Sequence, residues 1–217
     1  MTDPVYLIEK VALHNNLKQR ALKNGKLQVL PSAFWREYQQ VEIAAFCVMH
    51  GFYLIPTTEL VEWLRERIAG RTAIEVGSGN GVLAETLGIR ATDSRQQSKA
   101  EIAAIYWMLG QGTVPYGDNV ETIPAHDAVG KYRPDVVIGA WVTHKFNVSQ
   151  AWREGNGDGL DEVAIVCRAD YINIGHTYVH RAKPVLEIPH EIHYPDWLVS
   201  RALSPGKNYI AVWPKEN

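Results

Sequence analysis

The chain has 217 residues, enough for one α/β domain with an extension at one end. Its formal net charge of -2 lacks the positive excess typical of proteins that bind nucleic acids or anionic membranes, so both kinds of partner are disfavoured. The first residues, Met1-Thr2-Asp3-Pro4, lack the basic and apolar regions of a signal peptide, and no apolar run is long enough to span a bilayer, so we expect a cytoplasmic protein.

The first third of the chain has the pattern of a series of helices. Apolar residues recur at helical spacing in three segments, and each segment begins near a proline or threonine typical of a helix start. We therefore predict helices over residues 3–24, 31–51 and 57–70. The second of these segments is rich in aromatic residues.

From residue 72 onward, short apolar runs alternate with helical patterns. The alternation predicts strands at residues 72–76, 89–92, 120–123, 135–140, 162–167 and 208–213. Helices are expected between them, among others over residues 95–109 and 196–203. Strands without polar alternation are buried on both faces, so this order predicts a parallel sheet with helices covering both sides.

A glycine turn follows the first of these strands and predicts a ligand site. The sequence there is Glu75-Val76-Gly77-Ser78-Gly79-Asn80-Gly81, and Val82 occupies the place where a dinucleotide-binding turn has its third glycine. A carboxylate in the strand would repel a diphosphate, whereas it would favour a ligand with positive charge, such as a sulfonium or an ammonium group.

At this motif the chain resembles the class I S-adenosylmethionine-dependent methyltransferases, whose first motif is an acidic residue followed by G-x-G-x-G. The resemblance covers residues 71–141 well and the remainder loosely. It implies a doubly wound, mostly parallel α/β sheet of about seven strands. It also implies that S-adenosylmethionine is the cofactor and S-adenosylhomocysteine its product.

The same resemblance implies roles for individual residues. Within the motif, the residues implied to bind the cofactor are Glu75, Gly77, Ser78, Gly79, Asn80 and Gly81. Outside it, Asp93 is implied to bind the ribose hydroxyls, and Asp127 and Ala128 to lie near the adenine. Trp141, after the fourth strand, is implied to contact the cofactor as well. Asp93 could instead cap the following helix, and Asp127 could be a solvated loop carboxylate.

Two regions are expected along the chain, a helical extension over residues 1–70 and a cofactor-binding domain over residues 71–217. In the family such an extension often forms a lid, which would bring Tyr38, His50 and Tyr53 to the substrate. The alternative is that these three side chains only pack against the sheet.

Catalytic candidates lie after the fourth strand. His144 is the first candidate for a base or for a polar contact with the methyl acceptor, and Trp141 could form a wall of the substrate pocket. The alternatives are a surface histidine and a core tryptophan. Residues 140–143 read Ala-Trp-Val-Thr and lack the Pro-Pro-Tyr run of DNA amino-methyltransferases, and no Pro-Cys pair is present for methylation at carbon 5 of cytosine.

Four histidines lie close together in the sequence, at positions 176, 180, 190 and 193, and are candidate metal ligands. Neither pair has the H-E-x-x-H spacing, and the segment reads as strand or loop, so no metal is expected.

The sequence therefore predicts a methyltransferase that uses S-adenosylmethionine, with a small-molecule acceptor slightly preferred and no membrane partner. A protein or RNA methyltransferase stays open and would need a basic rim around the cleft. A protein that binds the cofactor without catalysis is a second alternative, and a nicotinamide oxidoreductase is a third that the glycine spacing disfavours.

Overall fold

The computed structural model describes residues 15–144 and 159–215. Residues 145–158, which follow the candidate His144, lie outside these ranges. Within the described ranges, no helix has the length and apolar character needed to cross a membrane.

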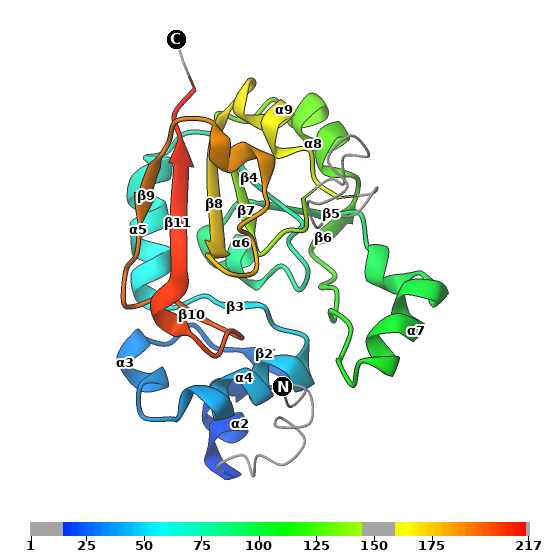
Figure 1. The fold of residues 1–217 in the computed structure, drawn as a ribbon, viewed down its shortest axis with the longest axis vertical. Coiled ribbons are helices and arrows are strands. Elements are labelled where there is room, and N and C mark those ends of the chain that lie inside the picture. The colour runs from blue at the N-terminus through cyan, green and yellow to red at the C-terminus, as the bar shows by residue number, and fades with distance from the viewer. Residues whose placement is uncertain (1–14, 145–158, 216–217) are drawn as a thin grey trace.

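Seven strands of the described chain form one sheet (Figure 1). Their order across the sheet is β6 (Val120–Thr122), β5 (Arg90–Asp93), β4 (Ala73–Val76), β7 (Val136–Ala140), β8 (Asp170–His176), β11 (Asn208–Trp213) and β9 (Glu191–His193). The first five are parallel to one another, while β11 is antiparallel to both of its neighbours. This confirms the mostly parallel, doubly wound sheet of about seven strands that the sequence predicts.

Helices cover both faces of this sheet. One face packs on α5 (Thr58–Ile68) and α6 (Val82–Leu87). The other packs on α8 (Ala125–Tyr132), α9 (Glu162–Val166) and the 3-10 turn η3 (Pro184–Glu187). Successive residues of a strand point to opposite faces, which is why a strand such as β7 is apolar throughout.

Helix α7 (Ala100–Met108) differs from these helices, because none of its residues is buried. It follows a 3-10 turn, η1 (Gln96–Ser98), and projects from the sheet at the right of Figure 1.

The N-terminal elements form a smaller cluster beside the sheet, below it in Figure 1. They are α2 (Asn15–Ala21), β1 (Leu22–Lys23), β2 (Lys26–Leu27), α3 (Ser32–Trp35), α4 (Gln40–His50) and β3 (Leu54–Ile55). Their core contains Trp35 and Phe46 and extends to Val199 of β10 (Val199–Ser200), which pairs with β3. A 3-10 turn, η4 (Pro205–Lys207), leads from this region into β11.

Several predicted elements differ from the structure. The second predicted helix is divided into α3 and α4, because Gln39 has an extended backbone and forms a capping box with Glu42. Within the first predicted helix, the described part ends at Ala21, where the hairpin of β1 and β2 begins.

The fifth predicted strand is also wrong, because residues 162–167 contain helix α9 and the strand is β8. Asp161 caps α9 by accepting a hydrogen bond from the Ala164 N–H at 3.2 Å. The helix predicted over residues 196–203 is absent as well; Val199 and Ser200 form strand β10 there.

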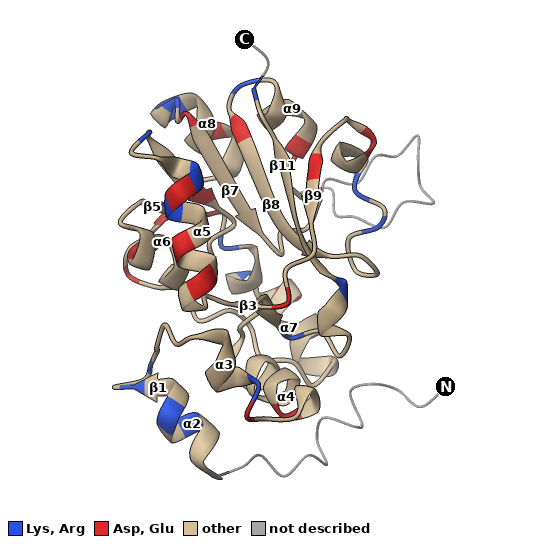
Figure 2. Ribbon diagram, turned by 90° about the vertical axis from the view of Figure 1, so that its left-hand side faces the viewer, with Lys and Arg blue, Asp and Glu red and all other residues tan. Residues whose placement is uncertain are grey.

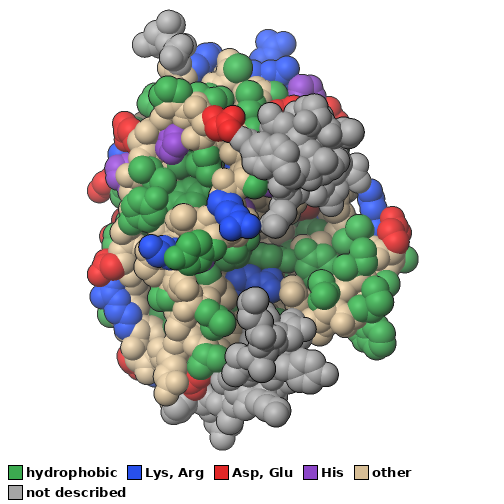
Figure 3. Space-filling model, in the orientation of Figure 1, with side chains coloured by type: hydrophobic (Ala, Val, Ile, Leu, Met, Phe, Trp, Pro, Cys, Tyr) green, Lys and Arg blue, Asp and Glu red, His purple; other side chains and the backbone are tan. Residues whose placement is uncertain are grey.

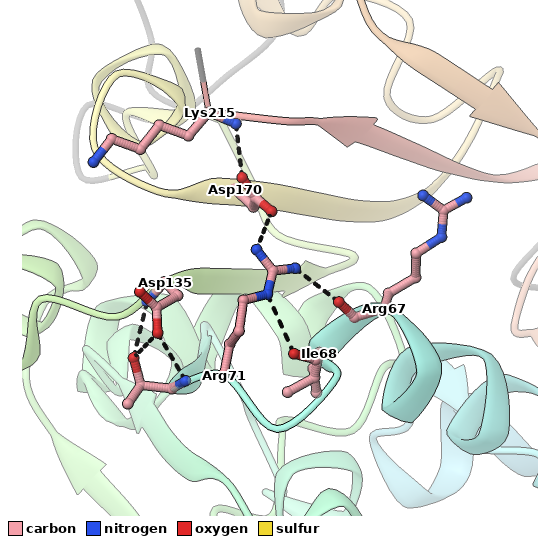
Figure 4. A network of polar contacts seen from close by, with 7 residues as sticks. Arg67, Ile68, Arg71, Asp135, Asp170 and Lys215 are labelled. Carbon is pink, nitrogen blue, oxygen red and sulfur yellow. Dashed lines mark hydrogen bonds and ion pairs between the residues drawn. The ribbon is translucent and has the colours of Figure 1, made fainter. Parts of the chain in front are cut away.

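Polar contacts join the strands at the edge where the parallel strands begin (Figure 4). Arg71 donates to Asp170 at 2.6 Å, and Asp170 also accepts from the Lys215 N–H at 2.7 Å. Asp135 accepts from both the N–H and the hydroxyl of Thr72. These contacts tie β4, β7, β8 and the end of β11 together.

Candidate functional site

A cleft of about 940 Å³ lies at the carboxyl ends of the parallel strands. Ligands of open α/β sheets bind at this edge. Its described lining comes from the turn after β4, the end of β5, the residues after β6 and β7, and α7 on the outer side. The wall also includes Gly51 and Tyr53 of the N-terminal region, residues 159–161 and Ala164 of α9.

The glycine turn after β4 forms part of the lining. Gly77 has φ +62°, and a Cβ at that position would lie 2.6 Å from the Val142 side chain. Gly77, Ser78, Gly79 and Asn80 line the cleft. Gly81 does not; it packs against Val120 of strand β6 and against Asn119 just before that strand.

Ser78 fixes this turn to strand β5. Its N–H donates to the Thr92 carbonyl at 3.0 Å, and its hydroxyl accepts from the Thr92 N–H at 2.9 Å. The Ser78 hydroxyl also lies 2.9 Å from the Glu75 carbonyl, to which it donates. The backbone of the turn is therefore held in place by the strands below it.

The backbone N–H groups around the turn are occupied by side chains of this chain. Glu75 accepts from the Ala84 N–H at 3.1 Å, Asn80 from the Val82 N–H at 3.0 Å, and Asp93 from the Gly79 N–H at 2.9 Å. A phosphate-binding turn leaves such donors open to the ligand. This turn instead presents two carboxylates.

Both carboxylates have raised pKa values. Burial raises the pKa of Glu75 to about 8, and the neighbouring charge of Asp93 adds to the effect. Burial also raises the pKa of Asp93, although its hydrogen bonds from Gly79 and Arg95 partly oppose this. Desolvation disfavours a buried carboxylate, so a positive ligand at the cleft would stabilise the charged form of both groups.

The outer wall is an aromatic and amide network. Tyr53 donates to the Tyr106 hydroxyl at 3.1 Å and accepts from the Gln97 amide at 3.3 Å. The Gln97 amide oxygen accepts from the Val114 N–H at 2.9 Å, and its backbone N–H donates to the Tyr116 hydroxyl. The network fixes the η1 segment against the N-terminal region.

Trp141 lies at the end of β7, on the cleft, with a left-handed backbone at φ +56°. Such a conformation is costly for a residue with a Cβ, and it often marks a functional position. The ring centroid lies 6.2 Å from that of Tyr53 and 5.2 Å from that of His180. Its indole N–H is buried and has no hydrogen-bond partner among the described residues.

The structure does not bring all the predicted residues to this cleft. Asp127 and Ala128 lie in helix α8, where Asp127 is exposed and Ala128 belongs to the core beneath the sheet, so neither lines the cleft. The residues at this point of the cleft are Pro124, Ala125 and His126, just before them.

Three more candidates lie elsewhere. His144 is buried, and the neighbouring Thr143 rather than His144 lines the cleft. Tyr38 donates to Asn16 and accepts from Arg20 within the N-terminal cluster. His50 packs on Phe46 and Phe52, and burial lowers its pKa. Of the three predicted lid residues, only Tyr53 lines the cleft.

The histidines considered as metal ligands have other contacts. His180 accepts from the His176 N–H at 2.9 Å, and His176 lies 3.0 Å from the Ser204 carbonyl. His190 packs on Trp213, while His193 packs on Trp63. Among the described residues, no group of three or more side chains could hold a metal ion.

Gln97, Tyr106 and Tyr116 are cleft residues that the sequence did not single out. For Gln97 a signal existed, since it comes four residues after Asp93 at the end of a strand. Tyr106 and Tyr116 had no such signal, because they reach the cleft only through the outward course of α7 and the loop that follows it.

Comparison with known proteins gives only distant structural neighbours. No family model and no curated protein matches this sequence. An rRNA methylase from Streptococcus thermophilus is similar in structure, with 12% identity, 72% of this chain and 97% of that chain covered, and a TM-score of 0.38.

A SAM-dependent methyltransferase from Agrobacterium tumefaciens has 9% identity, covers 72% of this chain and 61% of that chain, and gives a TM-score of 0.34. The mitomycin 7-O-methyltransferase has 16% identity, covers 85% and 58% of the two chains, and gives a TM-score of 0.35.

Proposed function

We propose that this protein is a methyltransferase that uses S-adenosylmethionine. The observation that carries the proposal is the pair of carboxylates at the glycine turn. Glu75 and Asp93 take the backbone N–H groups of Ala84 and Gly79, so the turn presents two carboxyl groups where a phosphate-binding turn presents open donors.

This arrangement favours a cationic ligand over a nicotinamide dinucleotide. A diphosphate would find the N–H groups of Gly79, Val82 and Ala84 already bonded to this chain. It would also lie beside two carboxyl groups. S-adenosylmethionine carries an ammonium and a sulfonium group, and its ribose hydroxyls can donate to a carboxylate.

The residues on the cleft fit this cofactor in distinct ways. Gly77 and Gly79 keep the turn free of side chains where a ligand would approach, and Asp93 has oxygen lone pairs left for ribose hydroxyls. A positive ligand would lower the pKa of the buried Glu75, so binding near pH 7 should release a proton. When bound, the cofactor supplies a methyl group on a positively charged sulfur.

The acceptor that we propose is a small molecule with an apolar or aromatic part. Tyr53, Tyr106, Tyr116 and Trp141 give the cleft aromatic walls, which suit such a ligand. Among the described lining residues, Lys99 is the one lysine or arginine, whereas an RNA acceptor calls for a basic rim.

A cofactor-binding protein without catalysis is the second candidate. His144, the predicted base, is buried behind the lining, so the described cleft offers no histidine beside Trp141 at the end of β7. Methyl transfer to an acceptor that is already nucleophilic needs orientation more than a base, and orientation alone can contribute about 7–11 kcal/mol. Turnover with an acceptor would decide between the two candidates.

Ligand-dependent thermal unfolding tests the cofactor. We expect both S-adenosylmethionine and S-adenosylhomocysteine to raise the melting temperature, because a ligand at a hundred times its Kd adds about 2.7 kcal/mol to stability. NAD should have no effect at the same concentration. A rise with NAD alone, or with none of the three ligands, would refute the proposal.

A further inference from the structure

A second cavity, of about 630 Å³, lies at the amino ends of the parallel strands, at the other end of the sheet from the cleft. We call it the basic cavity. Figure 3 shows lysine and arginine side chains, in blue, at the top of the molecule, where β11 ends in Figure 1. The described lining of the cavity includes four basic and two acidic residues, which are Arg71, Arg133, Arg168, Lys215, Asp135 and Asp170.

Arg71 and both acidic residues already have partners within the chain. Arg71 donates to Asp170 at 2.6 Å and to two backbone carbonyls at the end of α5, at 3.3 and 2.8 Å (Figure 4). Asp135 accepts from the N–H and the hydroxyl of Thr72. The charges of Arg71 and Asp170 therefore balance each other, and Asp135 is the one acidic residue left among those in the described lining.

The other three basic residues are available to a ligand. The side chains of Arg133, Arg168 and Lys215 form no hydrogen bond or ion pair within the described chain. Their three positive charges lie on the same cavity as the single negative charge of Asp135. The cavity thus has an excess of two positive charges.

Two of these basic residues follow the ends of helices. Arg133 is the C-cap of α8, and Arg168 comes two residues after α9 ends. The carboxyl end of a helix has at most about half a negative charge, so the two ends together balance about one of the excess positive charges. Positive charge therefore remains in the cavity, and it favours an anionic ligand.

The backbone of Arg133 has a left-handed conformation, with φ +45°. Glycine is the usual residue for such a helix end, because a Cβ makes this conformation costly. A costly backbone conformation of this kind is often found at ligand sites. Here the residue that bears the cost places an unpaired guanidinium group on the cavity.

We propose that the basic cavity binds the phosphate monoester of a small molecule. A phosphate monoester has three terminal oxygens that can accept hydrogen bonds from the three available cations, and its charge near pH 7 is about -1.5 to -2. A carboxylate has only two oxygens. The cavity volume of about 630 Å³ is typical of small-molecule sites, so an organic part of the ligand fits beside Val129 and Pro134.

Cys167 provides a readout at the cavity itself. It is an exposed residue of the lining, whereas Cys47, the other cysteine of the chain, is buried. We expect phenyl phosphate to bind in isothermal titration calorimetry. At a hundred times its Kd it should slow the alkylation of Cys167 by iodoacetamide roughly 10-fold or more, because nearly all sites are then occupied. Phenol, which lacks the phosphate, should do neither.

Arg133→Gly distinguishes a loss of binding from a loss of folding. It removes one cation and places glycine in the left-handed conformation, so the melting temperature without ligand should not fall. The affinity for phenyl phosphate should fall roughly 10-fold or more, and Arg168→Gln should have a similar effect. Arg181→Gln is the matched control, because Arg181 is exposed, lies outside the cavity and also forms no hydrogen bond or ion pair within the described chain.

The proposal is wrong if phenyl phosphate does not bind, if it binds without protecting Cys167, or if both cavity variants keep the full affinity. Equal weakening by Arg181→Gln would also overturn it. Binding of a single-stranded oligoribonucleotide without binding of phenyl phosphate would assign the cavity to RNA instead. None of these measurements requires S-adenosylmethionine, so S-adenosylhomocysteine binding on the same samples bears only on the proposed function.

Discussion

Asp93 and Asp127 allow a direct test of which carboxylate binds the cofactor. We expect Asp93→Asn to weaken S-adenosylhomocysteine binding by roughly 10- to 100-fold, because hydrogen bonds to a charged group contribute about 1.5–3 kcal/mol each. Asp127→Asn should leave the affinity unchanged, since Asp127 is exposed on α8 away from the cleft. Isothermal titration calorimetry measures both affinities.

The unliganded variants provide the control for this comparison. Asp93 also accepts from the Gly79 and Arg95 N–H groups, so the melting temperature without ligand shows whether the turn itself has changed. Loss of affinity in Asp127→Asn with none in Asp93→Asn would reverse the two assignments.

Glu75 should make the stability of the protein depend on pH in an unusual direction. Its pKa is raised from 4.5 to about 8, so between these values the folded state holds a proton that the unfolded state has lost. The free energy of unfolding should therefore fall as pH rises from about 4.5 to 8, at up to about 1.4 kcal/mol per pH unit.

Glu75→Gln removes this titration and keeps an oxygen that can accept from the Ala84 N–H. Urea unfolding gives the free energy of unfolding at pH 5 and at pH 8. Between these pH values, the unmodified chain should lose several kcal/mol more of this free energy than the variant does. Parallel pH profiles for the two proteins would mean that Glu75 is ionised in the folded state.

At the level of single residues, the sequence could predict the glycine motif, because the geometry of this motif depends on residues that are close together in the chain. The glycines and Glu75 lie in one short strand and turn, so local spacing places most of them on the cleft. The positions of Asp127 and His144 depended on where β6 and β7 end and on which way the chain leaves them. A side chain a few residues beyond such an end can be buried, as His144 is after β7 ends at Ala140.

In the unit formed by β4, the glycine turn and α6, substitutions at two glycines distinguish the cost of the backbone conformation from the cost of steric crowding. Gly77 and Gly88 have similar positive φ angles, +62° and +70°, but a Cβ at Gly77 would lie 2.6 Å from Val142 while one at Gly88 would meet nothing within 4 Å. Gly88→Ala should cost about 1–2 kcal/mol for the left-handed conformation alone.

Gly77→Ala should cost about 1–3 kcal/mol more, because it also overpacks the turn. Urea unfolding gives both values, and adding Val142→Ala should recover part of the extra loss. Equal losses for the two glycines would show that Val142 moves aside freely.

Secondary structure elements were predictable where the local pattern is unambiguous. Helix α5 was predicted closely, because Thr57 caps it through the Leu60 N–H and its apolar stripe has helical spacing. The run at residues 162–167 was not, because a short apolar segment fits a buried strand or a buried helix equally well. The hydrogen bond from the Ala164 N–H to the Asp161 side chain identifies a helix start, but only the structure shows this bond.

The strand β10 was unpredictable for a different reason. Val199 and Ser200 form a strand only because Ile55 and Leu54 lie beside them, about 145 residues earlier in the chain. The helix predicted over residues 95–109 has nearly the predicted end, but α7 begins only at Ala100, after η1. Its outward direction could not be predicted, because its helical pattern specifies no partner face.

For the whole molecule, the division into an extension over residues 1–70 and a domain over residues 71–217 stays a prediction. Helix α5 lies before residue 71, yet Leu60, Val61, Leu64 and Ile68 are buried in the core of the sheet. In Figure 2 the ribbon of this helix carries both blue and red segments, so residues of both charges lie along it. Its amphipathic pattern thus serves the sheet.

Two shortened chains would locate the boundary. A chain beginning at residue 71 loses four buried side chains of α5, each worth about 1.5–3 kcal/mol, which together match the total stability of a typical domain. We expect it to show no cooperative thermal transition by circular dichroism. A chain beginning at Tyr53 keeps α5 and the β3–β10 pair, and should unfold cooperatively at a lowered temperature, because Ile55 and Val199 lose their contacts with Trp35 and Phe46. Cooperative unfolding of the shorter chain would instead make α5 part of a separable extension.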